Sequence, residues 1–150
     1  MLRPVGHGDV RFLRDLLRHA YHWRLNEDPD LPVFRYVANW GREGDAGVIA
    51  FDGRGAYGAA WYRLFSADEP GFGFVDEGTP ELTIAVVPSR RRHGVGQELL
   101  DALVERAREA GYERVSLSVE EGSPAVAFYE RNGFAPVGSA EGGIVMTRGL

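Results

Sequence analysis

The stretch from Glu81 to Gln97, ELTIAVVPSRRRHGVGQ, joins an apolar run to a basic turn that contains two glycines. The run from Leu82 to Val87 is rich in β-branched residues and stops at Pro88, which predicts a short strand buried on both faces of a sheet. After the turn, apolar residues recur at helical spacing, which predicts an amphipathic helix starting at the glycines. These residues are Val95, Leu99, Leu103 and Ala107.

This strand–turn–helix has the composition of an anion-binding loop. The first amides of a helix lack intrahelical partners and carry partial positive charge, and glycine lets the backbone approach a ligand closely. Three consecutive arginines, Arg90 to Arg92, would repel one another unless a ligand or neighbouring carboxylates offset them. A capped turn on a surface helix is the alternative. The spacing excludes a P-loop and disfavours a dinucleotide site, because Leu99 stands where a third glycine would be.

A second motif lies nearer the C-terminus. Val115 to Val119 alternates apolar and polar residues, which predicts a strand with one apolar face. SPAVAFYERNGF, residues 123–134, then predicts a short helix. Ser123 is its expected N-cap, Pro124 lies in its first turn and Gly133 is its expected C-cap.

Arg91-x-x-Gly94-x-Gly96 after an apolar strand resembles the coenzyme A pyrophosphate signature of the GCN5-related N-acetyltransferase (GNAT) superfamily, and residues 123–134 look like that family's second motif. The N-terminal half fits more loosely. Its expected elements are a strand at Leu2–Pro4, a helix over Val10–Ala20 and strands at Gly47–Phe51 and Tyr57–Phe65. The resemblance implies one α+β domain over residues 1–150, with a twisted, mostly antiparallel sheet of about six to seven strands and about four helices.

The resemblance also implies an activity, the transfer of an acetyl group from acetyl-CoA to a primary amine, directly within a ternary complex and without a metal. The backbone amides of Val86 and Val87 would pair with the pantetheine arm of the coenzyme. Ser123 stands where many members have an asparagine that contacts this arm. The pyrophosphate would be held at the basic turn by Arg91, Arg92, His93, Gly94, Val95, Gly96 and Gln97.

Two residues are candidates for the proton transfers. Tyr129 occupies the position of the family's tyrosine, so the resemblance assigns it as the general acid for the departing thiolate and as part of the coenzyme site. Glu81 is the candidate general base, because some members use a glutamate near this point, and strand alternation places it on one face with Thr83. A solvent-exposed cap at the strand end is an equal alternative. Asp76 and Glu77 are substitutes.

The residues that would bind the acceptor are harder to predict. Aromatic residues in regions that face the acceptor in this superfamily are Trp23, Trp40, Trp61 and Tyr62. A place in the core is the alternative for them and is favoured for Trp61. The glycine-rich segment Ser66–Thr79 is the expected mobile loop. Its acidic pairs, Asp68-Glu69 and Asp76-Glu77, would either draw a cationic amine or simply be solvated.

Composition limits the remaining function classes. The 150 residues carry a net charge of −5 and one basic cluster, so no nucleic-acid partner is expected. The chain has no cysteine, which rules out disulfides, thiolate metal sites and a cysteine nucleophile. His19 and His22 lack a ligand pattern, so no metal is expected.

The N-terminus has no apolar stretch of secretory or membrane-spanning length, so a cytoplasmic location without membrane contact is the expectation. Oligomeric state stays open, with a homodimer as the ordinary assumption. Two other functions also stay open. One is a non-catalytic acyl-CoA sensor, and the other is a scaffold whose arginine turn docks an acidic partner.

Overall fold

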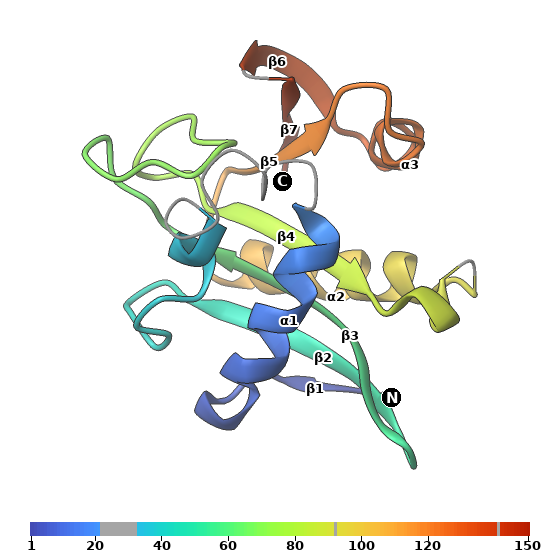
Figure 1. Cartoon of the computed structure of the whole chain (residues 1–150). Helices are drawn as coiled ribbons and strands as arrows, with labels where there is room; N and C mark the ends of the chain where they lie inside the picture. The colour runs from blue at the N-terminus through green and yellow to red at the C-terminus, as the bar shows by residue number, and fades with distance from the viewer. Residues whose placement is uncertain (22–32, 92, 141) are drawn as a thin grey trace.

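A computed structural model describes residues 1–21, 33–91, 93–140 and 142–150 (Figure 1). Its strands form one seven-stranded sheet in the order β1-β2-β3-β4-β5-β7-β6. The strands are β1 (Leu2–Pro4), β2 (Ala46–Asp52), β3 (Gly55–Arg63), β4 (Glu81–Val86), β5 (Arg114–Glu120), β6 (Ala135–Ala140) and β7 (Gly143–Gly149). The helices are α1 (Val10–Ala20), α2 (Val95–Glu109) and α3 (Ala125–Arg131), with 3₁₀ turns η1 (His7–Asp9), η2 (Val33–Tyr36) and η3 (Pro88–Arg90).

The α+β class and the mostly antiparallel sheet are confirmed, since among the strands of the described residues only β4 and β5 pair in parallel. The described residues form three α-helices, where about four were expected. In those described ranges, no helix has the length and apolar character needed to cross a membrane.

Helices cover both faces of the sheet. Figure 1 shows α1 in front of the central strands and α2 behind them. The apolar stripe of α1, which includes Leu13, Leu16 and Leu17, is fully buried on its face, as helical periodicity requires. Strand β4 serves both cores, because Leu82 packs with α2 while Ala85 packs with α1. The prediction of a strand buried on both faces is therefore confirmed.

Strands β4 and β5 part soon after they meet. They share one register pair, Glu81 with Ser116, next to a bond from the Ser116 amide to the Pro80 carbonyl of 3.0 Å. Strand β5 instead pairs with β7 along its whole length, from Arg114 to Glu120. Beyond the first pair, no strand of the described residues pairs with β4 on this side. The sheet is split in its middle.

The glycine-rich segment Ser66–Thr79 is anchored at its centre, between β4 and β5. The Gly73 amide donates to Glu81 Oε1 at 3.0 Å, and the Phe72 amide donates to the Tyr36 hydroxyl at 2.9 Å. Gly73 also approaches β5 so closely that a Cβ atom there would lie 2.6 Å from the backbone carbon of Leu117. This contact explains why the segment needs a glycine at that position.

A buried ion pair supports η2. The Arg63 guanidinium bonds to both carboxylate oxygens of Asp45, at 2.9 and 2.7 Å, and the two side chains are 1% and 2% exposed. The same guanidinium donates to the carbonyls of Arg35 and Ala38, at 2.8 and 2.6 Å. Trp61 Nε1 donates to the Tyr36 carbonyl at 3.0 Å. Strand β3 thereby fixes the turn that carries Tyr36.

Candidate active site

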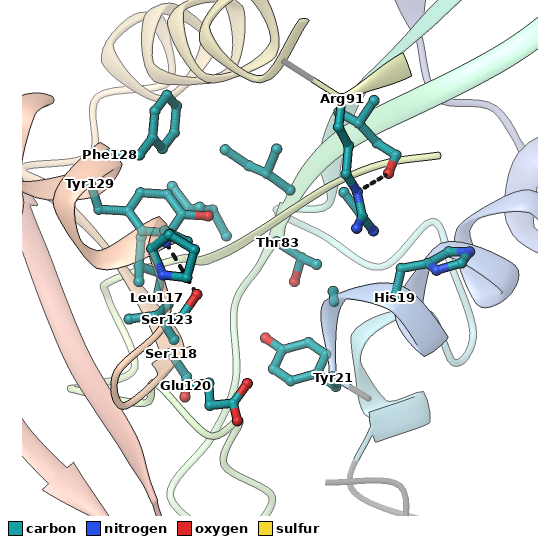
Figure 2. Close-up of a pocket in the computed structure, with 18 residues that line it drawn as sticks. His19, Tyr21, Thr83, Arg91, Leu117, Ser118, Glu120, Ser123, Phe128 and Tyr129 are labelled. Carbon is teal, nitrogen blue, oxygen red and sulfur yellow. Dashed lines mark hydrogen bonds between the residues drawn. The ribbon is translucent and has the colours of Figure 1, made fainter. Parts of the chain in front are cut away.

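A cleft of about 390 Å³ opens where β4 and β5 part (Figure 2). Its walls come from the end of α1 on one face of the sheet, from α3 on the other, and from the two strands between them. The lining residues are His19, Ala20, Tyr21, Leu82, Thr83, Ile84, Ala85, Val86, Arg91, Leu117, Ser118, Val119, Glu120, Ser123, Pro124, Ala125, Phe128 and Tyr129. Residues from both faces of the sheet therefore line the cleft.

Backbone polar groups of β4 line the open edge. The Val87 amide donates to the Tyr57 carbonyl of β3 at 2.9 Å, so alternate residues of β4 direct their backbone toward β3. Val86 is offset by one residue and faces the gap, where its carbonyl accepts a bond from Arg91 Nε at 3.1 Å. Of the two amides expected at the pantetheine arm, Val86 faces the cleft and Val87 does not.

The arginines of the basic turn have different surroundings. Arg90 donates to Asp52 at 2.6 Å and stacks over the Tyr57 ring at 4.6 Å. A neighbouring carboxylate therefore offsets this charge, which was one of the alternatives left open by the sequence. Arg91 lines the cleft instead. Arg92 lies outside the described residues.

The turn leads into the N-terminus of α2. Gly94 is the N-cap with φ of +78°, a left-handed conformation that favours glycine, and nothing lies within 4 Å of the place where its Cβ would be. Val95 and Gly96 form the first turn, whose amides have no intrahelical acceptor. Gly94 and the neighbouring His93 are exposed. The turn is therefore open to an anion from solvent.

Gln97 connects helices. Its Nε2 donates to Asp101 at 2.9 Å and to Asn132 at 2.7 Å, and the Asn132 amide donates back at 3.2 Å. Asn132 also donates to the Phe128 carbonyl at 2.9 Å. The Gln97 side chain thus ties the start of α2 to the end of α3, the helix that carries Tyr129.

Tyr129 projects its hydroxyl into the cleft from α3, as Figure 2 shows. Its ring packs edge-on against Phe128 and Phe134, with centroids 5.3 and 5.5 Å away. Burial raises the pKa of Tyr129 to about 12, so the hydroxyl keeps its proton at neutral pH. Such a group can donate a hydrogen bond to a developing anion.

The start of α3 differs by one residue from the expectation. The helix begins at Ala125 with Pro124 as N-cap, rather than with Ser123 as N-cap. The Ser123 hydroxyl still accepts from the Ala125 amide at 3.1 Å, because its side chain reaches over the proline, which has no N–H. Gly133 follows the C-cap Asn132 with φ of +88°, the ordinary helix-terminating conformation.

Glu81 is not among the residues lining the cleft. Its side chain is 1% exposed, and it accepts bonds from the Tyr36 hydroxyl and the Gly73 amide. The alternative of a solvent-exposed strand cap is therefore wrong. The carboxylate lies behind the cleft, on the face of β4 that it was predicted to share with Ala85, and that face packs against α1.

The substitute bases are not cleft residues either. Asp76 pairs with Arg114 at 2.6 Å, and this bond lowers the pKa of Asp76. Glu77 lines a separate pocket with Glu69, so the described structure places these carboxylates away from the cleft.

The aromatic candidates for the acceptor groove that the structure describes do not line the cleft either. Trp61 is fully buried and Tyr62 is 3% exposed, so both are core residues. Trp40 packs against the Arg63 guanidinium, 5.5 Å from its ring centroid. Trp23 lies outside the described residues. The aromatic residue that does line the α1 side of the cleft is Tyr21.

Sequence reasoning missed Tyr21, and a signal was present. It follows Leu17 by four residues and so continues the apolar stripe of α1 with a side chain that has a hydroxyl. Tyr36, its ring neighbour, lies in a short turn with no periodic pattern to mark it.

Comparison with known proteins identifies the family. Residues 10–134 match the profile of the acetyltransferase (GNAT) family. The chain belongs to this family. No curated protein sequence matches it. In the described ranges, no group of three or more potential metal ligands clusters together.

Solved structures similar to this GNAT chain share its fold at low identity. Ribosomal-protein-alanine N-acetyltransferase from Brucella melitensis is 23% identical with a TM-score of 0.71, covering 100% of this chain and 99% of that one. PaiA N-acetyltransferase from Thermoplasma acidophilum, in complex with coenzyme A, is 15% identical with a TM-score of 0.73, at 100% and 98% coverage. A phosphinothricin acetyltransferase from Sinorhizobium meliloti, in complex with AcCoA, is 21% identical with a TM-score of 0.69, at 100% and 88%.

Proposed function

We propose that this protein transfers an acetyl group from acetyl-CoA to a primary amine, directly within a ternary complex. The observation that carries the proposal is the split between β4 and β5, with a coenzyme-compatible backbone edge along one wall and the Tyr129 hydroxyl in its interior. Family membership supports the reaction class. Two of the similar structures hold coenzyme A or its acetyl ester, which supports the choice of acyl donor.

The residues present fit the coenzyme at two places. The Val86 amide faces the cleft and can bond to an extended arm as a neighbouring strand would. The open turn at Gly94, with the free amides of Val95 and Gly96, can hold a diphosphate, and Arg91 adds a positive charge on the same side. The Val87 amide is already bonded to β3, so we leave it out of the proposed contacts.

The reaction needs two proton movements. The acceptor ammonium must lose a proton before its nitrogen can attack the thioester carbon, since its lone pair is otherwise occupied. As a C–N bond forms and the C–S bond breaks, the departing sulfur takes up negative charge and the nitrogen loses its second proton, which balances the proton that the sulfur gains. The Tyr129 hydroxyl can donate a hydrogen bond to that sulfur.

The pKa of about 12 limits how far Tyr129 can transfer its proton to the leaving sulfur. A thiol has a pKa of about 8.5, so full transfer of the phenolic proton to the thiolate would be uphill. We therefore assign Tyr129 to stabilising the charge on the leaving sulfur by a hydrogen bond, with complete transfer following only as the product forms.

Thiol release tests the proposal directly. The chain has no cysteine, so a thiol-reactive dye reports only the coenzyme A that is set free. The protein would be mixed with acetyl-CoA and a panel of polyamines, amino acids, aminoglycosides and peptides with free N-termini, with an amine-free sample as control. Amine-dependent release is expected for at least one acceptor. Coenzyme binding without release from any amine would favour the sensor alternative, and the absence of binding would reject both.

A further inference from the structure

A second pocket lies apart from the cleft, between the turn that follows η2 and the segment 66–79. In Figure 1 these two parts of the chain both lie at the left of the view. The pocket has a volume of about 310 Å³, near the lower end of the range of about 300–1,000 Å³ for small-molecule sites. No described residue lines both this pocket and the cleft, so the two sites are separate.

Two cationic and two anionic side chains line the pocket, and they do not pair with one another. They are Arg35 and Arg42, which precede β2, and Glu69 and Glu77, which follow β3. Within the described residues, none of these four side chains takes part in an ion pair. A ligand that carries both charges can contact groups that are too far apart to contact each other.

The two guanidinium groups are held in place by backbone oxygens. Arg35 Nη1 donates to the Pro70 carbonyl, and Arg42 Nη2 donates to the Leu64 carbonyl, each at 3.0 Å. A guanidinium has five N–H donors, so each arginine keeps others for a ligand. A carboxylate is the ligand group that fits them best, because it can accept two parallel bonds from one guanidinium.

The electrostatic surroundings of Arg42 also favour an added anion. Burial lowers the pKa of Arg42, and the positive charge of Arg63 lowers it further. Asp45 and Glu69 oppose this shift to a smaller degree, and the Asp45 carboxylate is already bonded to Arg63. A ligand carboxylate beside Arg42 would therefore offset a charge that the protein compensates only in part.

The two glutamates are placed by turns within the segment 66–79. The Glu69 amide donates to the carbonyl and to the hydroxyl of Ser66, each at 3.2 Å. A second turn, closed by a bond of 3.4 Å from the Thr79 amide to the Asp76 carbonyl, carries Glu77. Two carboxylates on this wall of the pocket are the natural partners of an ammonium group, which has three donors and no acceptor.

We propose that this pocket binds an α-amino acid with an aliphatic side chain, as the free zwitterion. The ligand carboxylate would bond to the two arginines and its ammonium to the two glutamates. Its side chain would contact Leu64 and Phe65, which supply the apolar part of the lining. The inference does not rest on the proposed function, because the pocket shares no described residue with the cleft.

Nuclear magnetic resonance titration tests the proposal on the whole protein, without acetyl-CoA. The ligands would be leucine, valine and alanine, with two analogues of leucine as controls. Isocaproate lacks the ammonium group of leucine, and isoamylamine lacks its carboxylate. The amino acids are expected to shift the amide signals of Arg42 and Glu69 in a saturable way. Each analogue should bind at least about tenfold more weakly than leucine, because it leaves one pair of charged partners without a bond.

Variants of the pocket locate the binding. Arg42→Gln and Glu69→Gln should each weaken leucine binding by about tenfold or more, and Arg42→Lys, which keeps the charge but has fewer donors, should fall between Arg42→Gln and the parent. Their thermal unfolding without ligand should match that of the parent, because neither side chain belongs to an ion pair within the described structure. Arg108→Gln and Glu105→Gln, from an exposed pair elsewhere, are the matched controls and should retain parental affinity.

Three results would overturn the proposal. One is the absence of saturable shifts with all three amino acids. Another is equal affinity for leucine and isocaproate, because the glutamates would then play no part. The third is parental leucine affinity in a folded Arg42→Gln variant, which would place the ligand elsewhere, for example in the cleft as an acceptor. None of these measurements uses thiol release, so failure of the proposed function would be seen separately.

Discussion

Loss of charge at Asp45 should destabilise the fold strongly. The Asp45 carboxylate accepts two bonds from Arg63 at 2.9 and 2.7 Å, and it also accepts the amides of Gly41 and Arg42, each at 2.9 Å. Both partners of the ion pair are at most 2% exposed. Asp45→Asn keeps the shape but leaves the Arg63 charge buried without compensation, which costs about 3–5 kcal/mol. At about 2–4 °C per kcal/mol for a chain of this size, Tm should fall by about 6–20 °C.

Urea unfolding followed by tryptophan fluorescence and circular dichroism measures this loss. Glu105→Gln is the matched control, because Glu105 pairs with Arg108 at 3.5 Å on the surface, with side chains 60% and 46% exposed. Such a pair contributes at most about 1 kcal/mol. A loss below about 1 kcal/mol for Asp45→Asn would refute the reasoning, because it would mean that water reaches the Arg63 guanidinium in the folded state.

Three further outcomes are expected. Tyr129→Phe should lower kcat by about 10²-fold or more with calorimetric coenzyme affinity nearly intact, and an unchanged kcat would remove Tyr129 from the mechanism. Gly94→Ala should cost about 1–2 kcal/mol in urea unfolding, because the φ of +78° is strained for alanine, and it should weaken coenzyme binding; equal stability to the parent would contradict the assigned turn. The bond from Arg114 lowers the pKa of Asp76. The stabilising effect of this bond is therefore present above the pKa of about 3.9 in the unfolded chain, and it is lost as the pH falls through the lower pKa of Asp76 in the folded state. The stability difference between parent and Asp76→Asn should therefore shrink on acidification, and a difference that grows would contradict the pairing.

Local patterns predicted the parts of the fold that depend on neighbours in sequence. Strand β4 follows from the apolar run ended by Pro88, and α2 follows from four-residue apolar spacing after Gly94. The basic turn was predictable from local sequence for the same reason, because its contacts with an anion would come from contiguous backbone amides. These features need no knowledge of distant residues.

The split of the sheet could not be predicted in this way. At the split, the backbone of Gly73 packs against that of Leu117, and these two segments are far apart in the chain. For the same reason the sequence placed Glu81 as a base but could not identify its partners. Tyr36 bonds to the carboxylate, and Tyr21 stacks on Tyr36, only through tertiary packing. Trp61 and Tyr62 were ambiguous because an aromatic residue in a strand suits a core and a ligand surface equally.

Amide hydrogen exchange at β4 tests the central claim most directly. The account predicts that saturating acetyl-CoA slows exchange of the Val86 amide, which faces the cleft, while the Val87 amide, already bonded to the Tyr57 carbonyl at 2.9 Å, changes little. Unchanged Val86 exchange in the presence of saturating acetyl-CoA would contradict the account, because the coenzyme would then not lie along the open edge of the strand.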